Sequence, residues 1–131
     1  MSVEVPAHLT PRQDPTFTQE QLSQYFEHIS FPNTDLSRPP SLEYLTEIQK
    51  YQLATVPFEN LTLHYSVHHR LSLDPHDLFA KVVGRRMGGY CMEANAFFGA
   101  ILSSLGFQLF NAGGRVSDAT TGRPGNRFMG W

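Results

Sequence analysis

Apolar residues at helical spacing, in runs that follow capping residues, constrain the fold of this chain more than any other feature of its sequence. Thr18 and Gln21 form a capping box before the first run. Its apolar face is expected to hold Leu22, Tyr25, Phe26 and Ile29. Ser41 can cap a second helix that Pro57 closes. The apolar stripe expected on this second helix contains Leu42, Leu45, Ile48 and Gln49 to Gln52.

The next part of the chain is predicted to be extended and then helical. Apolar and polar residues alternate between Leu61 and Val67, which is typical of a short strand. Helix is expected to resume with Asp74 as the cap and Pro75 at the first position, and to end at Gly84. Its apolar face is expected to hold Leu78, Phe79, Val82 and Val83.

A further helix is predicted to start near Gly89 or Tyr90 and to end at Gly106, which places Cys91 in its first turn. Cys91 is the only cysteine, so the chain has no internal disulfide. The start of a helix favours the thiolate, the form of cysteine that acts as a nucleophile. Gly88 and Gly89 allow a close backbone approach, which would leave space for a substrate carbonyl. From periodicity alone, a small buried core cysteine remains the alternative.

The predicted fold class is α+β, with a helical bundle followed by the first strands of a truncated β-barrel. Residues 1–16 are expected to be a flexible tail, 17–106 the bundle that carries the cysteine, and 107–131 the start of the barrel. Within that last part, 107–110 and 114–116 are predicted to be strands.

Composition excludes several classes of protein. The 131 residues include 40% hydrophobic and 17% charged residues, which is typical of a soluble folded domain. The net charge of -2 and the lack of a basic run argue against nucleic acid as a partner. The sequence has neither an apolar stretch of about 20 residues nor a signal-peptide pattern, so we expect a cytoplasmic location and no membrane partner.

Two segments resemble the N-terminal signatures of the arylamine N-acetyltransferases. They are the segment VPFENL at residues 56–61 and the segment RRMGGYCMEAN at residues 85–95. The similarity extends from about Gln21 to Val116. The resemblance implies a three-part enzyme, with a helical bundle bearing the cysteine, a β-barrel bearing His and Asp, and a C-terminal α/β lid.

The resemblance also implies the chemistry. Cys91 would take an acetyl group from acetyl-CoA, or an acyl group from another acyl-CoA, and pass it to an arylamine or hydrazine by a ping-pong route. The acyl-CoA would be a co-substrate, and no permanently bound cofactor or metal is expected. Phe58 is a candidate for lining the amine pocket, with a core position as the alternative. CoA contacts in this family lie mainly in parts that the chain does not match, so we assign no CoA-binding residue.

One position departs from the family pattern. Met87 stands where the family usually has Arg, and the resemblance pairs that Arg with the Glu of the first signature. Arg86 or Arg85 is therefore expected to approach Glu59.

The chain matches no triad His or Asp of the family, so we expect it to be inactive alone. One alternative is a non-catalytic, truncated remnant of such an enzyme. Another is a papain-like or transglutaminase-like enzyme, which also places Cys at a helix start. Acylation of Cys91 by acetyl-CoA, rather than by a peptide amide, would separate this last alternative from an acetyltransferase.

Other conspicuous residues are given structural interpretations. His64, His68 and His69 could supply two metal ligands by spacing, but the segment is predicted to be extended and offers no third ligand. We therefore expect surface or turn histidines there. His8, His28 and His76 match no family position, and none is assigned as a catalytic base. Core packing is expected for Phe97, Phe98, Phe107 and Phe110.

Overall fold

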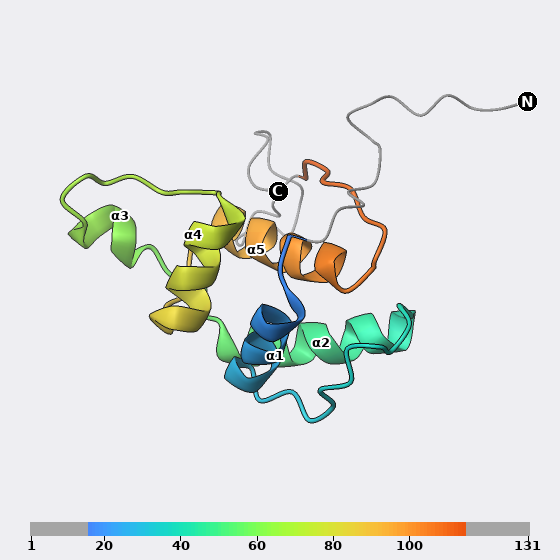
Figure 1. Ribbon diagram of the computed structural model, residues 1–131. Coiled ribbons are helices and arrows are strands. Elements are labelled where there is room, and N and C mark those ends of the chain that lie inside the picture. The colour runs from blue at the N-terminus through green and yellow to red at the C-terminus, as the bar shows by residue number, and fades with distance from the viewer. Residues whose placement is uncertain (1–15, 115–131) are drawn as a thin grey trace, which may run out of the picture.

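The computed structural model describes residues 16–114, which form a helical unit (Figure 1). Its elements are α1 (Gln19–His28), α2 (Leu42–Thr55), α3 (Leu61–Tyr65), α4 (Pro75–Phe79), the π-helical turn η2 (Ala80–Gly84) and α5 (Cys91–Ser104). Across this described range the chain has no strand, and one isolated parallel bridge joins Phe58 to Gly89. The helical part of the predicted fold class is confirmed, whereas the barrel strands are not seen.

Local capping chemistry fixes the helix starts where the sequence predicts them. The Thr18 hydroxyl accepts a hydrogen bond from the amide of Gln21, and the Gln21 side chain accepts one from the amide of Thr18. The Ser41 hydroxyl accepts from the amide of Tyr44. The Asp74 carboxylate accepts from two amides in the first turn of α4. Each cap satisfies amides that have no partner inside the helix.

The core lies where α1, α2, α4, η2 and α5 pack together. Its fully buried side chains include Tyr25, Phe26, Ile29, Tyr44, Ile48, Leu78, Phe97 and Ile101. The Tyr25 hydroxyl donates a hydrogen bond of 2.7 Å to the Gln52 side chain inside this core. The predicted stripe of α2 is partly wrong, because Leu42 is 78% exposed and Tyr44 is buried in its place. Aromatic packing between Tyr44 and the rings around it selects that face.

The segment predicted to be extended after Asn60 is helical. α3 carries no buried residue, and Figure 1 shows it apart from the other helices. The Glu59 carboxylate accepts a hydrogen bond of 2.6 Å from the amide of Leu61, and this contact satisfies a free donor at the start of α3. The prediction of a strand from the alternating pattern is wrong, because the apolar residues of this segment do not form a buried face: Tyr65 is 83% and Val67 is 90% exposed.

The chain after α5 also differs from the prediction. Gly106 ends the helix with a φ of 95°, as its position suggested. Residues 107–110 form no strand, because a strand needs a hydrogen-bonding partner and the described residues provide none. Residues 115 and 116 of the second predicted strand, and the predicted tail up to residue 15, lie outside the described range. Thr16 is docked, since its amide donates to the Ser104 hydroxyl.

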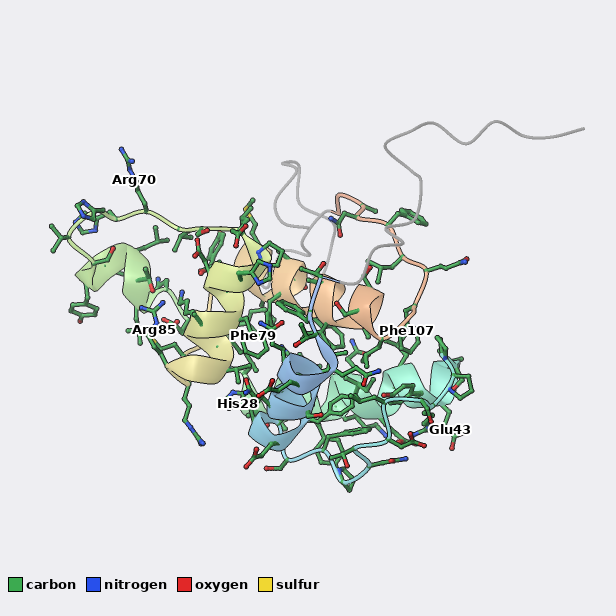
Figure 2. The ribbon with its side chains drawn as sticks, in the orientation of Figure 1. His28, Glu43, Arg70, Phe79, Arg85 and Phe107 are labelled. Atoms are coloured by element: carbon green, nitrogen blue, oxygen red, sulfur yellow. The ribbon has the colours of Figure 1, made fainter. Side chains whose placement is uncertain are left out.

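The aromatic residues assigned to the core divide into three groups. Phe97 is fully buried, and Phe98 and Phe107 are partly buried against the core. Figure 2 shows Phe79 and Phe107 directed toward the interior of the unit. Phe110 is 59% exposed, so its core assignment is wrong. Within the described residues, no helix has both the length and the hydropathy needed to cross a membrane.

Candidate active site

Cys91 is the first residue of α5, as the sequence predicts, and its side chain is half-buried. It lines an open pocket of about 400 Å³. The other lining residues are Phe58, Glu59, Asn60, Gly89 and Tyr90. The prediction that Cys91 begins a helix and faces a cleft is therefore confirmed, and the alternative of a fully enclosed core cysteine is wrong. The first amides of a helix lack partners within the helix and favour negative charge nearby.

Two distant segments of the sequence form the pocket through direct backbone contacts. The amide of Glu59 donates to the carbonyl of Gly89 at 2.9 Å, and the amide of Gly89 donates to the carbonyl of Pro57 at 3.2 Å. A Cβ atom on Gly88 would lie 1.9 Å from the Pro57 carbonyl oxygen. The predicted close approach at the glycines is therefore real, and its partner is the chain's own Pro57–Glu59 segment.

A buried cluster of charged side chains lies beside the backbone bridge between Phe58 and Gly89. The Lys81 ammonium is 2.7 Å from the Glu93 carboxylate and 3.9 Å from the Glu59 carboxylate. Lys81 and Glu93 are 5% and 3% exposed. The second Glu93 oxygen accepts a hydrogen bond of 3.0 Å from the amide of Tyr90 and so caps α5. Sequence analysis missed Lys81, although it follows the buried Leu78 by three residues and therefore shares the inward face of its helix.

The predicted pairing of Glu59 with Arg86 or Arg85 is not formed. Both arginine side chains are exposed, and among residues 16–114 the cation within ion-pair distance of Glu59 is Lys81. The end of η2 explains the difference. The amide of Met87 donates to the carbonyl of Lys81, and Arg86 has a φ of 54°. This reversal of the chain leaves Arg85 on a separate polar pocket of about 260 Å³ that Lys81 and Glu93 also line.

Phe58 is 60% exposed and lines the Cys91 pocket, so its alternative as a core residue is excluded. Pro57 and Phe58 are held by the bridge to Gly89, which presents the Phe58 ring at the pocket rather than to the interior. An exposed aromatic ring beside a cysteine offers a flat apolar surface to a ring-bearing ligand.

The histidines of the described residues lie elsewhere. His64, His68 and His69 are exposed, and none of them lines the Cys91 pocket. The structural reason given against a metal site was partly wrong, because His64 lies on a helix, α3. Within residues 16–114, no three side chains of His, Cys, Asp or Glu are placed to hold a metal ion together.

His28, the last residue of α1, has a lowered pKa. The larger cause is partial burial, and the smaller is the positive charge of Arg86.

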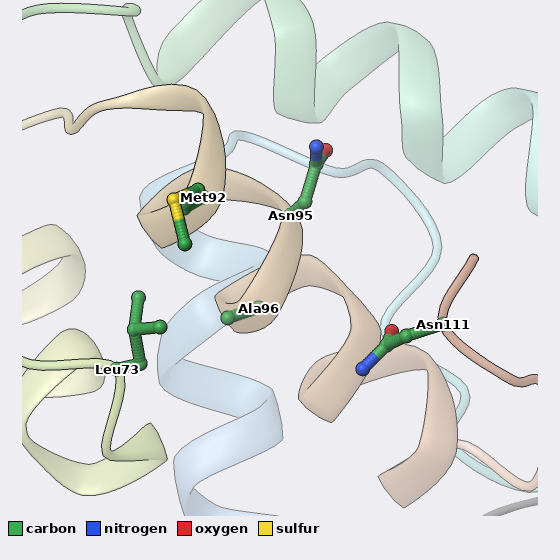
Figure 3. Close-up of a pocket in the computed structure, with 5 residues that line it drawn as sticks. All are labelled: Leu73, Met92, Asn95, Ala96 and Asn111. Atoms are coloured by element: carbon green, nitrogen blue, oxygen red, sulfur yellow. The ribbon is translucent and has the colours of Figure 1, made fainter. Parts of the chain in front are cut away.

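A separate apolar pocket of about 220 Å³ lies along α5. Figure 3 shows Met92, Asn95 and Ala96 on α5, with Leu73 of the segment before α4 to their left and Asn111 of the segment after α5 to their right. Because Met92 directly follows Cys91, the start of α5 borders both pockets.

Comparison with known proteins identifies relatives that are named as N-acyltransferases. The sequence profile of a family described as N-acetyltransferase matches residues 41–127. The N-malonyltransferase FDB2 of Gibberella moniliformis is 43% identical over 122 residues, which cover 82% of this chain and 35% of the relative. Arylamine N-acetyltransferase 2 of Mesocricetus auratus is 32% identical over 107 residues, which cover 82% of this chain and 34% of the relative.

Solved structures agree with these sequence relatives. The arylamine N-acetyltransferase of Nocardia farcinica aligns with a TM-score of 0.64 and 33% identity, over 79% of this chain and 36% of that structure. The enzyme of Mycobacterium abscessus aligns with a TM-score of 0.64 over 93% of this chain and 40% of that structure. The chain thus spans about a third of the length of its curated relatives. By its sequence profile, its relatives and its fold, the chain belongs to the arylamine N-acetyltransferase family.

Proposed function

We propose that Cys91 accepts an acyl group from an acyl-CoA and passes it to the nitrogen of a small amine, in the cytoplasm. The observation that carries this proposal is the position of Cys91: it begins α5 and lines an open pocket whose other wall is the Phe58–Asn60 segment. The family match favours acyl transfer over the papain-like and transglutaminase-like alternatives.

The reaction has two covalent steps. The Cys91 thiolate attacks the thioester carbonyl of the acyl-CoA, so a new S–C bond forms and the bond to the CoA sulfur breaks. CoA leaves as a thiolate and takes up a proton. The amine nitrogen then attacks the Cys91 thioester, an N–C bond forms, the Cys91 sulfur leaves, and the amine loses a proton. Amides at the start of α5 are suited to stabilise negative charge that develops beside Cys91.

The amine is proposed to be an arylamine or a hydrazine. The exposed Phe58 ring in the pocket supports an aromatic substrate, because offset or edge-to-face ring contacts favour such a ligand. The proposed acyl donors are acetyl-CoA and malonyl-CoA, since one relative is named an N-malonyltransferase and another an arylamine N-acetyltransferase.

Repeated turnover needs a proton shuttle that the described site does not contain. Within the described residues, no histidine or aspartate lines the Cys91 pocket. The amine must lose a proton and the CoA thiolate must gain one, and a positioned base commonly contributes about 10²–10⁴-fold to such steps. A site formed by residues 16–114 alone is therefore expected to complete both steps slowly, with little turnover beyond the first acyl group.

A single-turnover assay tests the proposal. The chain is incubated with acetyl-CoA or malonyl-CoA and then with aniline, and both released CoA and N-acylated aniline are measured. We expect up to one equivalent of product per chain, which Cys91→Ser abolishes. Equal product from Cys91→Ser would contradict the role of Cys91. Sustained turnover at an enzymatic rate would show that a residue of this chain supplies the base, and complete absence of transfer would favour the non-catalytic alternative.

A further inference from the structure

Lys81 is the point at which the two walls of the Cys91 pocket meet inside the molecule. It projects from η2, and its ammonium lies 2.7 Å from Glu93 of α5 and 3.9 Å from Glu59 of the opposite wall. Its side chain is 7% exposed, although lysine is among the residues least often buried without a partner. A buried ammonium between carboxylates from two walls holds those walls at a fixed separation.

The backbone of Lys81 contacts the same site by a second route. Its carbonyl accepts a hydrogen bond of 3.1 Å from the amide of Met87, where the connection from η2 to α5 begins. At the other end of that connection, Glu93 joins the Lys81 ammonium to the amide of Tyr90, the residue before Cys91. Lys81 therefore holds both ends of the segment that carries the two glycines into α5.

Glu59 shows what the cluster would lose without Lys81. One Glu59 oxygen accepts from the amide of Leu61, while the other is buried and has no hydrogen-bond partner. The Lys81 ammonium is the cation within ion-pair distance of that second oxygen in the described part of the chain. Without Lys81, two carboxylates would share a buried site with no compensating charge, and repulsion would drive the Glu59 segment away from α5.

We propose that Lys81 is a positioning residue for Cys91: it keeps the Pro57–Glu59 segment against the start of α5, and so sets the shape of the pocket in which Cys91 reacts. This inference rests on the proposed function for its effect on acyl transfer. The placement of the two walls, however, can be measured without any reaction. A displacement of about 1 Å in a reacting group can lower a rate by roughly 10²-fold.

The test compares three substitutions with the unchanged chain. Lys81→Met removes the charge at similar length, and Lys81→Arg keeps the charge with a different shape. Lys50→Met is the matched control, because Lys50 is exposed on α2, and these are the chain's only lysines. Two quantities are measured on each: the exchange rates of the Glu59 and Gly89 amides, whose hydrogen bonds form the bridge, and the rate of acyl transfer from acyl-CoA to Cys91.

We expect Lys81→Met to speed exchange of the Glu59 and Gly89 amides at least about tenfold more than that of the α1 and α2 amides, and to slow acylation of Cys91 at least about tenfold. Lys81→Arg should restore part of the protection of the bridge amides and part of the acylation rate. Lys50→Met should change neither quantity. Unchanged bridge amides in Lys81→Met would overturn the proposal. Equal acceleration of all amides would also overturn it, by showing a general structural role.

A double variant keeps the test decisive if Lys81→Met does not fold. Lys81→Met with Glu93→Gln removes both charges of the closer pair and keeps an oxygen that can cap Tyr90. We expect this variant to regain thermal stability, because the repulsion between the two carboxylates is removed. Its bridge amides should still exchange fast, because the buried Glu59 oxygen that faced Lys81 is left without a cation or a hydrogen-bond partner. Protected bridge amides in the double variant would contradict the positioning role. If the unchanged chain accepts no acyl group, the proposed function fails, and the exchange rates alone decide the role of Lys81.

Discussion

The side of the molecule where α1, α2 and α5 pack and the side that carries Cys91 are stabilised by different interactions. On the packed side, Tyr25, Phe97 and Ile101 are completely buried, and aromatic rings contact one another in a continuous cluster. Around Cys91, large apolar side chains remain in solvent: Phe58 is 60% and Tyr90 is 43% exposed, and both line the pocket. Burial of apolar area holds the first region, whereas backbone hydrogen bonds, one glycine contact and a charge cluster hold the second.

This contrast shows how one small unit separates stability from placement of a reactive group. Packing in the core is non-directional and tolerates small shifts of its neighbours. The Phe58–Gly89 bridge and the Lys81 cluster are directional, so small changes there should displace the pocket without unfolding the core. Substitutions confined to one region should therefore leave the other largely unchanged.

The largest effect on stability is expected from Phe97→Ala. Phe97 is fully buried, and its ring lies near those of Phe17, Tyr25 and Phe79. Loss of such a ring lowers the free energy of unfolding by about 3–5 kcal/mol, because a cavity remains. Phe110→Ala is the matched control: Phe110 is 59% exposed, and we expect a change within about 0.5 kcal/mol. Denaturant unfolding measures both, and equal losses would contradict the described core.

A smaller and more local effect is expected from Gly88→Ala. The new methyl group would lie 1.9 Å from the Pro57 carbonyl oxygen, so the bridge must open. We expect a cost of about 1–3 kcal/mol, together with altered reactivity of Cys91 toward a neutral alkylating reagent.

Gly84→Ala provides the control for the glycine substitution. A Cβ atom at Gly84 meets nothing within 4 Å, and the residue has no positive φ. The free energy of unfolding of the Gly84→Ala variant should stay within about 1 kcal/mol of that of the unchanged chain. Equal alkylation rates of Cys91 in both glycine variants and in the unchanged chain would show that the bridge does not shape the pocket.

The smallest expected effect concerns His28, at the boundary between α1 and the Cys91 side. Partial burial, then the nearby positive charge of Arg86, lowers its pKa below 6.5. The unfolded chain therefore binds more protons at this position as the pH falls below about 6.5, and folding stability falls with it. We expect His28→Gln to reduce this slope in thermal midpoints measured from neutral to mildly acidic pH. An unchanged slope would mean that His28 is not the group responsible.

Sequence reasoning succeeded where local chemistry decides the structure. The helix starts at α1, α2 and α4 are predicted correctly because the side chains of Thr18, Ser41 and Asp74 accept hydrogen bonds from amides in the first turn. The position of Cys91 in the first turn of α5 is also predicted correctly, because Gly106 and the Gly88–Gly89 pair mark the two ends of that helix. Those signals involve residues that are close in the sequence, so a single chain without relatives reveals them.

The errors came from contacts between distant residues. The role of Lys81 depends on Glu59 and Glu93, which lie 22 residues before and 12 residues after it in the numbering and meet it only after folding. The pairing expected for Arg85 or Arg86 is not formed because the chain reverses after the end of η2, where Arg86 has a positive φ. The strand predicted at 107–110 requires a partner strand, which spacing within one segment cannot reveal.

The most direct test of the central claim is a peptide map of the chain after incubation with acetyl-CoA or malonyl-CoA. We predict one acyl group on the peptide that contains Cys91, released by hydroxylamine as a thioester is and absent from Cys91→Ser. Iodoacetamide labelling of the same peptide without acyl-CoA confirms that the thiol is accessible. An accessible Cys91 that gains no acyl group, or an acyl group found only as a hydroxylamine-resistant amide elsewhere, would contradict the account.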